Sequence, residues 1–290
     1  MGRLSIEALP RPEPTYQITR LPTPNGAQMV FESRSFATCE NGKRGIGLRA
    51  HANAAPDLYS NRQARRLAFR LGRPVTDMWR TPASSLYMGH FRFRVIGALW
   101  KLIEEGPWDP RKVVFFTVRP REWEVPPEHL SGLRAERLMA QLKTRLNRAG
   151  ASQADGFLIA FLHGEFEPTS GRYVLHAHGF AVGGMVDVLE SLRGTKEEPG
   201  WLPKGRLNRS RKPITNLPYV LGYAFKSFWP CKRVGPVGKD GLVARNRHGQ
   251  RIPEPFHSQY LVWLDQHSVS DLSLLMKLRV TCDGLVPTCL

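Results

Sequence analysis

The sequence is poor in cysteine and in acidic residues, and it contains no long apolar run. None of its apolar runs approaches the roughly 20 residues needed to cross a bilayer, and the first residues, MGRLSIEALPRPEP, lack the apolar core of a signal peptide. The four cysteines show no C-x-x-C spacing, which argues against a zinc ribbon or a disulfide framework and favours free thiols. We therefore expect a cytoplasmic protein without a membrane partner.

The shortage of acidic residues gives the chain a large positive charge. It has 42 Lys+Arg against 25 Asp+Glu, a formal charge of +17 and a pI near 10.3. Such an excess favours a polyanion as partner. Charge alone does not choose among DNA, RNA and acidic lipid, and a basic surface can also serve solubility.

The first 110 residues divide into two segments. Residues 1–56 are rich in Pro, Gly, Asn and Ser without a sustained period, which predicts an extended or partly disordered arm. Residues 57–110 read as a basic helical segment, with helices over 57–73 and 86–105. The first helix carries Arg62, Arg65 and Arg66, which are candidates to lie on DNA phosphates; a solvated basic face is the alternative.

The pattern over 111–230 predicts an α+β core. Strands are expected over 112–119, 156–167 and 172–182, the last two as an antiparallel hairpin, and helices over 126–150, 185–193 and 216–229. A polar loop over 194–213 supplies further candidates for DNA binding: Lys204, Arg206, Arg209, Arg211 and Lys212.

Residues 231–290 are predicted to form a basic loop followed by helical pieces over 258–265 and 269–279. Ser268-x-x-Asp271 resembles a capping box ahead of the second piece. His248, His257 and His267 are expected at the surface.

The triplet His176-Ala177-His178 is the first candidate for chemistry. Residues two apart on a strand point to the same face, so both imidazoles can chelate one divalent cation. The preceding strand offers Glu165 and His163 on a common face. An oxygen ligand beside two nitrogens suits Mg²⁺ or Mn²⁺ at a phosphate, so Glu165 is the preferred third ligand and His163 the alternate.

Two tyrosines and a lysine form the second candidate. On a helix, Tyr219 and Tyr223 lie one turn apart on one face, and Lys226 follows on the same side. A phenol is a poor nucleophile at its usual pKa, and it needs a nearby cation and a phosphate activated by a metal. The alternative is that these tyrosines only pack in the core.

The order of these motifs resembles that of rolling-circle replication initiators of the HUH endonuclease superfamily. The motifs are an apolar strand ending in Thr (FFTVRP), a strand with His-hydrophobic-His (VLHAHGF) and a helix with Y-x-x-x-Y-x-x-K (YVLGYAFK), within 112–229. Relaxases of that superfamily have the tyrosine ahead of the histidines, so the order is similar to the Rep branch. Two tyrosines four apart resemble two-tyrosine phage initiators and related transposases. Gly222 departs from the pattern, because many two-tyrosine relatives have Lys there.

The resemblance implies a ferredoxin/RRM-like antiparallel sheet (the HUH fold) covered by helices, with extra helical segments at both ends. It implies that His176 and His178 bind Mg²⁺ or Mn²⁺, that Tyr219 or Tyr223 attacks a DNA phosphate, and that Lys226 is the accompanying cation. The products would be a 5′-phosphotyrosine link and a free 3′-OH. The expected partners are single-stranded origin DNA with a hairpin, a polymerase and a host helicase, since the chain has no P-loop.

Two other functions remain open at this point. A two-tyrosine transposase would use the same chemistry on transposon ends. A non-catalytic RRM-like nucleic-acid-binding protein would use the basic loop to grip a backbone, with His176 and His178 only packing.

Overall fold

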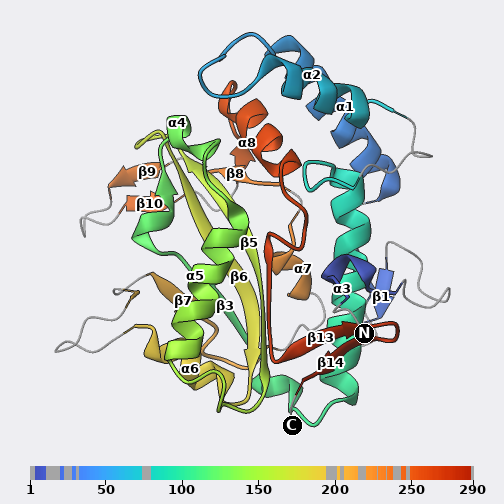
Figure 1. Cartoon of the computed structure of the whole chain (residues 1–290), viewed down its shortest axis with the longest axis vertical. Helices are drawn as coiled ribbons and strands as arrows, with labels where there is room; N and C mark the ends of the chain where they lie inside the picture. The colour runs from blue at the N-terminus through green and yellow to red at the C-terminus, as the bar shows by residue number, and fades with distance from the viewer. Residues whose placement is uncertain are drawn as a thin grey trace.

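The computed structural model describes residues 4–10, 20–22, 28–30, 33–73, 80–193, 201–202, 206–214, 220–226, 228–232, 234–237, 243–245 and 249–288. Over these ranges the chain is α+β (Figure 1). Its helices are η1 Ile6–Ala8, α1 Arg34–Ala50, α2 Asn61–Leu71, α3 Ser85–Glu105, η2 Pro110–Lys112, η3 Arg121–Trp123, α4 Pro127–Leu130, α5 Ala135–Arg148, α6 Met185–Ser191, α7 Leu221–Ala224 and α8 Phe256–Asp265.

Eight strands form one mixed sheet. Its order is β11-β8-β5-β6-β3-β7, with β12 also pairing with β5 and β4 with β6; the β5–β8 pair is parallel and the others are antiparallel. The strands of this sheet are β3 Val114–Val118, β4 Glu124–Val125, β5 Phe157–Glu167, β6 Arg172–Val182, β7 Leu207–Arg209, β8 Pro230–Cys231, β11 Gln250–Arg251 and β12 Ser273–Met276. Three two-stranded sheets pair β1 Arg20–Pro22 with β2 Gln28–Val30, β9 Val234–Val237 with β10 Val243–Arg245, and β13 Leu278–Thr281 with β14 Gly284–Pro287.

The hairpin β5–β6 is the centre of the sheet and confirms the predicted hairpin. Its register runs without a break from Phe157↔Val182 to Glu167↔Arg172. Ten of the eleven residues of β6 are buried, as are ten of β5, because helices cover both faces of the hairpin. This explains why both segments read as nearly continuous apolar runs.

Helices cover the two faces of the sheet. In Figure 1, α5 and α6 lie in front of the strands, and α3 stands beside the sheet with α7 between them. On the α7 side, Phe91 of α3 packs on Phe161 of β5 and Phe225, with ring centroids 5.9 and 6.2 Å apart. Phe161 lies opposite His178 in the β5–β6 register, so α3 and α7 cover the histidine face.

The prediction of an extended arm over 1–56 is wrong for residues 34–50. These residues form α1, which packs against α2, α3 and α8 and buries Leu48. Its three glycines and its polar residues hid the helical period. One of them has a packing reason, because a Cβ on Gly45 would lie 3.1 Å from the carbonyl oxygen of Ala68 in α2. The helices therefore approach more closely than larger residues allow.

The helix predicted over 269–279 is also wrong, since this segment forms β12 and β13. The capping-box hydrogen bonds do form, from Asp271 N–H to Ser268 Oγ at 3.1 Å and from Ser268 N–H to Asp271 Oδ2 at 2.8 Å. They close a turn and not a helix, because the next residues pair with the edge of β5. Long-range strand pairing overrides the local signal here.

The remaining predictions differ in smaller ways. The predicted helix over 216–229 is reduced, within the described residues, to α7 Leu221–Ala224. His257 and His267 are buried and not at the surface, because both lie against the aromatic residues of α8. Cys39, Cys231 and Cys282 are free thiols as expected. None of the described helices is long and apolar enough to span a membrane.

Candidate functional site

The strand register brings three histidines together on one face of the sheet. His163 of β5 lies directly opposite His176 of β6, and His178 follows two residues later on the same face. The ring centroid of His163 lies 5.3 Å from that of His176 and 5.5 Å from that of His178. All three side chains are buried, and one ligand nitrogen from each lies within 4.8 Å of the others.

Hydrogen bonds to groups outside the cluster occupy one nitrogen of each ring, and the other nitrogen of each is left to the cluster. His176 Nδ1–H donates to the Val174 carbonyl at 3.0 Å, and His163 Nε2–H donates to the Phe228 carbonyl at 3.0 Å. His163 Nδ1 is then buried without a hydrogen-bond partner. The Nε2 atoms of His176 and His178 lie 3.0 Å apart, a separation compatible with neighbouring ligands around an ion bound at about 2.1 Å.

A threonine supports the pair from the neighbouring strand. Thr117 of β3 lies opposite His178, and its Oγ1 is 2.8 Å from His178 Nδ1. Groups that hydrogen-bond the second nitrogen of a ligating imidazole fix its tautomer and orientation. Thr117 stands in the FFTVRP motif, but the sequence alone gave it no role.

Burial keeps the three imidazoles neutral. The pKa of His163 falls to about 3, first because of burial and then because of the positive charge of Lys226. Burial is also the first cause that lowers the pKa values of His176 and His178 well below the ordinary value, and the neighbouring imidazoles add to it. Neutral rings keep their lone pairs, which is the state that binds a metal ion.

The structure favours the alternate ligand, His163, over the preferred one, Glu165. Glu165 is buried on the same face, but it lies opposite Val174, one position beyond the histidine pair. Its carboxylate pairs with Lys232 and, at 3.5 Å, with Arg119. Two cations therefore already hold this carboxylate, which explains why the prediction of Glu165 as ligand is not supported.

One tyrosine of the predicted pair borders the histidines. The Tyr223 ring, on α7, lies edge-on to His178 with centroids 5.3 Å apart and to Phe115 at 5.5 Å. Its side chain is 43% exposed, so the phenol can reach a ligand from solvent. Lys226 Nζ lies 3.7 Å from the centre of the same ring. Tyr219 lies outside the described residues.

Positive charge gathers around the cluster. The basic side chains close enough to lower the pKa values of the imidazoles are Arg92, Arg119, Lys226 and Lys232. Arg92 of α3 also donates to the Gly222 carbonyl at 3.2 Å, which ties α3 to the helix that carries Tyr223. A phosphate approaching Tyr223 would thus meet an electropositive site. Sequence reasoning missed Arg92, Arg119 and Lys232, because they come from separate elements.

The residues predicted to bind DNA fall into two groups at different ends of the molecule (Figure 1). Arg62, Arg65 and Arg66 are exposed on α2, which packs on α1 and α8. Near β7, Arg211 and Lys212 are exposed, whereas Arg206 and Arg209 form ion pairs with Glu124 and Glu190. Lys204 lies outside the described residues.

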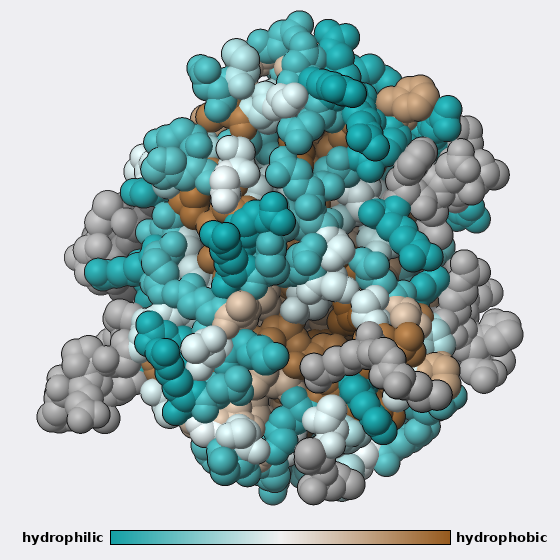
Figure 2. All heavy atoms as spheres, viewed as in Figure 1, coloured by the Kyte–Doolittle hydropathy of each residue, from teal (hydrophilic) through white to brown (hydrophobic). Residues whose placement is uncertain are grey.

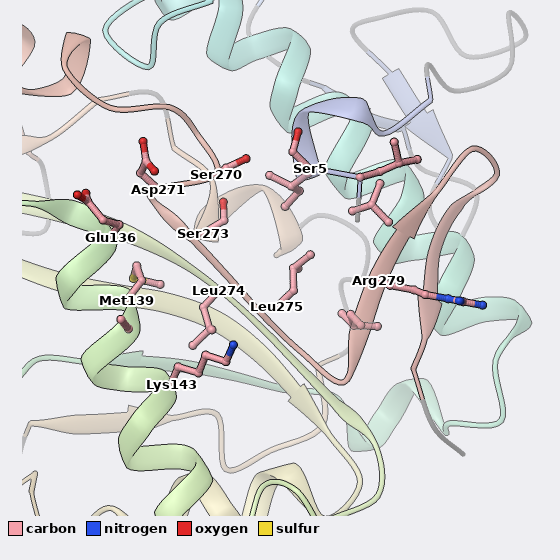
Figure 3. Close-up of a pocket in the computed structure, with 15 residues that line it drawn as sticks. Ser5, Glu136, Met139, Lys143, Ser270, Asp271, Ser273, Leu274, Leu275 and Arg279 are labelled. Atoms are coloured by element: carbon pink, nitrogen blue, oxygen red, sulfur yellow. The ribbon is translucent and has the colours of Figure 1, made fainter. Parts of the chain in front are cut away.

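A cavity of about 390 Å³ lies elsewhere, between α5, β12, β13 and η1 (Figure 3). Its walls carry Leu274, Leu275 and Met139, and Figure 2 shows apolar surface in the same region of a largely hydrophilic face. Its lining includes neither a histidine nor a tyrosine. The histidine cluster is therefore the better candidate for chemistry.

Comparison with known proteins gives no relative from which to transfer a function. No family model, curated protein or solved structure matches the chain.

Proposed function

We propose that this protein is a metal-dependent endonuclease that nicks and rejoins single-stranded DNA through a tyrosine and so initiates rolling-circle replication of a plasmid or phage. The observation that carries the proposal is the contact of the Tyr223 ring with His178, inside a buried three-histidine cluster that can hold an ion. A half-exposed phenol beside neutral imidazoles and lysine has the parts that phosphoryl transfer needs.

The topology supports an HUH-type sheet. With η3, β4 and α4 inserted between β3 and α5, the elements β3, α5, β5, β6, α6 and β7 occur in the order β-α-β-β-α-β, and their strands stand in the antiparallel order β5-β6-β3-β7. That is the arrangement of the ferredoxin-like motif, in which the third strand lies inside the sheet. The histidine pair lies on this inner strand, β6.

The donor set fits a divalent cation. Three imidazole nitrogens favour a transition metal over Mg²⁺, so we expect Mn²⁺ to bind more tightly than Mg²⁺. When bound, the ion would polarise a phosphate oxygen and stabilise the charge that develops on it. His163, His176 and His178 would hold it.

The side chains of the protein would perform the remaining steps. Tyr223 Oη attacks the scissile phosphorus and loses its proton to solvent, the bond from phosphorus to the 3′-oxygen breaks, and the 3′-oxygen takes a proton from solvent and leaves as a 3′-OH. Lys226, over the Tyr223 ring, places a positive charge beside the attacked phosphate. A later attack of a 3′-OH on the phosphotyrosine restores the phosphodiester and the phenol. Tyr219 remains the second candidate for this role.

The test is adduct formation on labelled single-stranded oligonucleotides that carry candidate origin sequences, in Mn²⁺, followed by denaturing electrophoresis. We expect an SDS-resistant adduct that EDTA abolishes and that Tyr223→Phe reduces at least about 100-fold. Tyr59→Phe is the matched control. The Tyr59 phenol donates to the His51 carbonyl, away from the three-histidine cluster, so this variant should keep the adduct. An adduct retained by the Tyr219→Phe, Tyr223→Phe double variant would remove the nucleophile assignment. If oligonucleotides with transposon ends form more adduct than those with origin sequences, the result would favour a transposase.

A further inference from the structure

A second cavity, of about 200 Å³, lies next to the peptide that supports His163. The carbonyl of Phe228 accepts the His163 hydrogen bond, and the Phe228 side chain lines this cavity. Its walls include α1, through Phe36 and Glu40, and β11, through Arg251, and α3 and α8 also contribute. The cavity and the histidine cluster therefore share residue 228 as a common boundary.

Two aromatic side chains of this cavity are unusually exposed. Phe36 is 56% exposed and Phe228 is 38% exposed, and with Tyr223 they make up half of the exposed large apolar side chains that the described residues contain. Exposed phenyl rings on a strongly basic protein are the feature with which single-stranded nucleic acids are held, because every base can stack on them.

The polar side of the cavity is built and fixed. Arg44 is 1% exposed, and its Nε donates to Glu40 Oε1 at 3.1 Å. Arg251 Nη2 donates to both oxygens of Glu40, at 2.8 and 2.6 Å. The two arginines hold the carboxylate in place, so this wall of the cavity keeps a fixed position beside the aromatic rings.

We propose that this cavity binds one unpaired base of the single-stranded DNA, next to the scissile phosphate. The inference rests on the proposed function, because residue 228 borders both the cavity and His163, which would hold the ion at the scissile phosphate. The net charge of +17 favours a nucleic acid over an apolar peptide as the occupant.

The experiment compares two ligands of equal charge. Binding of the full chain to labelled (dT)12 and to a labelled 12-mer of abasic nucleotides is measured by fluorescence anisotropy in EDTA, so that no cleavage occurs. The variants are Phe228→Ala, Phe36→Ala and Phe228→Tyr, which keeps an aromatic ring. Ile46→Ala is the matched control, because Ile46 is 62% exposed on the same helix as Phe36 and does not line the cavity.

We expect the unchanged protein to bind (dT)12 more tightly than the abasic strand, and Phe228→Ala and Phe36→Ala to reduce that preference, each by about 5- to 150-fold. Phe228→Tyr and Ile46→Ala should keep it. Alanine variants that keep the full preference, or an unchanged protein without any preference, would overturn the proposal. The assay needs neither metal nor cleavage, so failure of adduct formation alone would overturn the proposed function and leave the base site standing.

Discussion

Each histidine of the cluster is oriented by a different partner. Val174 and Phe228 provide carbonyl acceptors, and Thr117 provides a hydroxyl. These partners leave the second nitrogen of each ring within the cluster, where one nitrogen from each histidine lies within 4.8 Å of the others. A buried acceptor nitrogen without a hydrogen-bond partner, such as His163 Nδ1, costs about 1–3 kcal/mol, which an ion would recover.

The choice of third ligand can be tested with two substitutions. We expect His163→Ala to weaken Mn²⁺ binding by more than about 100-fold, because it removes one of three ligands. Loss of a group that only supports a ligand typically weakens binding by about 10- to 100-fold. Glu165→Gln should change the affinity only a few-fold, since its carboxylate pairs with Arg119 and Lys232. Isothermal titration calorimetry measures both. The reverse order of the two effects would restore Glu165 as ligand.

The lowered pKa of His163 predicts how the stability of the metal-free protein depends on pH. The folded-state pKa is about 3 and the unfolded value about 6.5, so between these values the unfolded chain binds more protons. The free energy of unfolding should therefore fall as the pH falls below about 6.5. His163 alone accounts for about 1.4 kcal/mol between pH 7.5 and 5.5.

Urea unfolding at the two pH values measures this difference. His163→Gln, which does not titrate, should show a smaller decrease than the unchanged protein. Equal decreases in both proteins would show that His163 does not carry the effect.

At the scale of elements, the packing around β6 leaves no room for a larger residue at Gly179, next to His178. A Cβ on Gly179 would lie 2.2 Å from the Ile159 carbonyl oxygen and 2.6 Å from the Phe116 ring. We expect Gly179→Ala to reduce the free energy of unfolding by about 1–3 kcal/mol or more through overpacking. Gly89→Ala in α3 is the control, because nothing lies within 4 Å of its added Cβ and the helix should gain up to about 1 kcal/mol.

Thermal unfolding of both variants gives the comparison. If Gly179→Ala is as stable as the unchanged protein, the close approach of Phe116 to β6 is not a constraint on the fold.

The sequence predicts the elements whose pattern is local. The hairpin of β5 and β6 and the helices α2, α3, α5 and α8 follow from period and turn residues, and so does the common face of His176 and His178. The strand β12 could not be predicted in this way, because only pairing with β5 makes it a strand. To choose His163 over Glu165 as the third ligand, one must know which residue of β5 lies opposite His176, and the sequence does not fix that register. Arg92 and Arg119 come from α3 and from the end of β3, which only the folded chain brings together.

At the scale of the whole molecule, positive charge is divided between the histidine site, α2 and the segment around β7. α2 stands at the far end from β7 (Figure 1), so the two could contact different parts of one DNA. The three predicted cations of α2 are all exposed, and we expect them to contribute chiefly through phosphate contacts.

The salt dependence of DNA binding tests this expectation. Replacing Arg62, Arg65 and Arg66 with Ala should lower the slope of log K against log[KCl] by about 2 to 3 for a labelled DNA hairpin. The matched control replaces Arg137, Lys143 and Arg148, which are exposed on α5, and should leave the slope nearly unchanged. Equal decreases in the two triple variants would mean that only total charge matters.

The central claim is that a phenol and three imidazoles, distant in the sequence, act on one phosphate. Mass spectrometry of the peptide that remains attached to a nucleotide, after digestion of the reaction with single-stranded DNA, tests it most directly. We predict a phosphonucleotide on Tyr223, formed in Mn²⁺ and lost in EDTA or in His178→Ala. A nucleotide attached at a residue remote from the histidines, or attached equally well in EDTA, would contradict it.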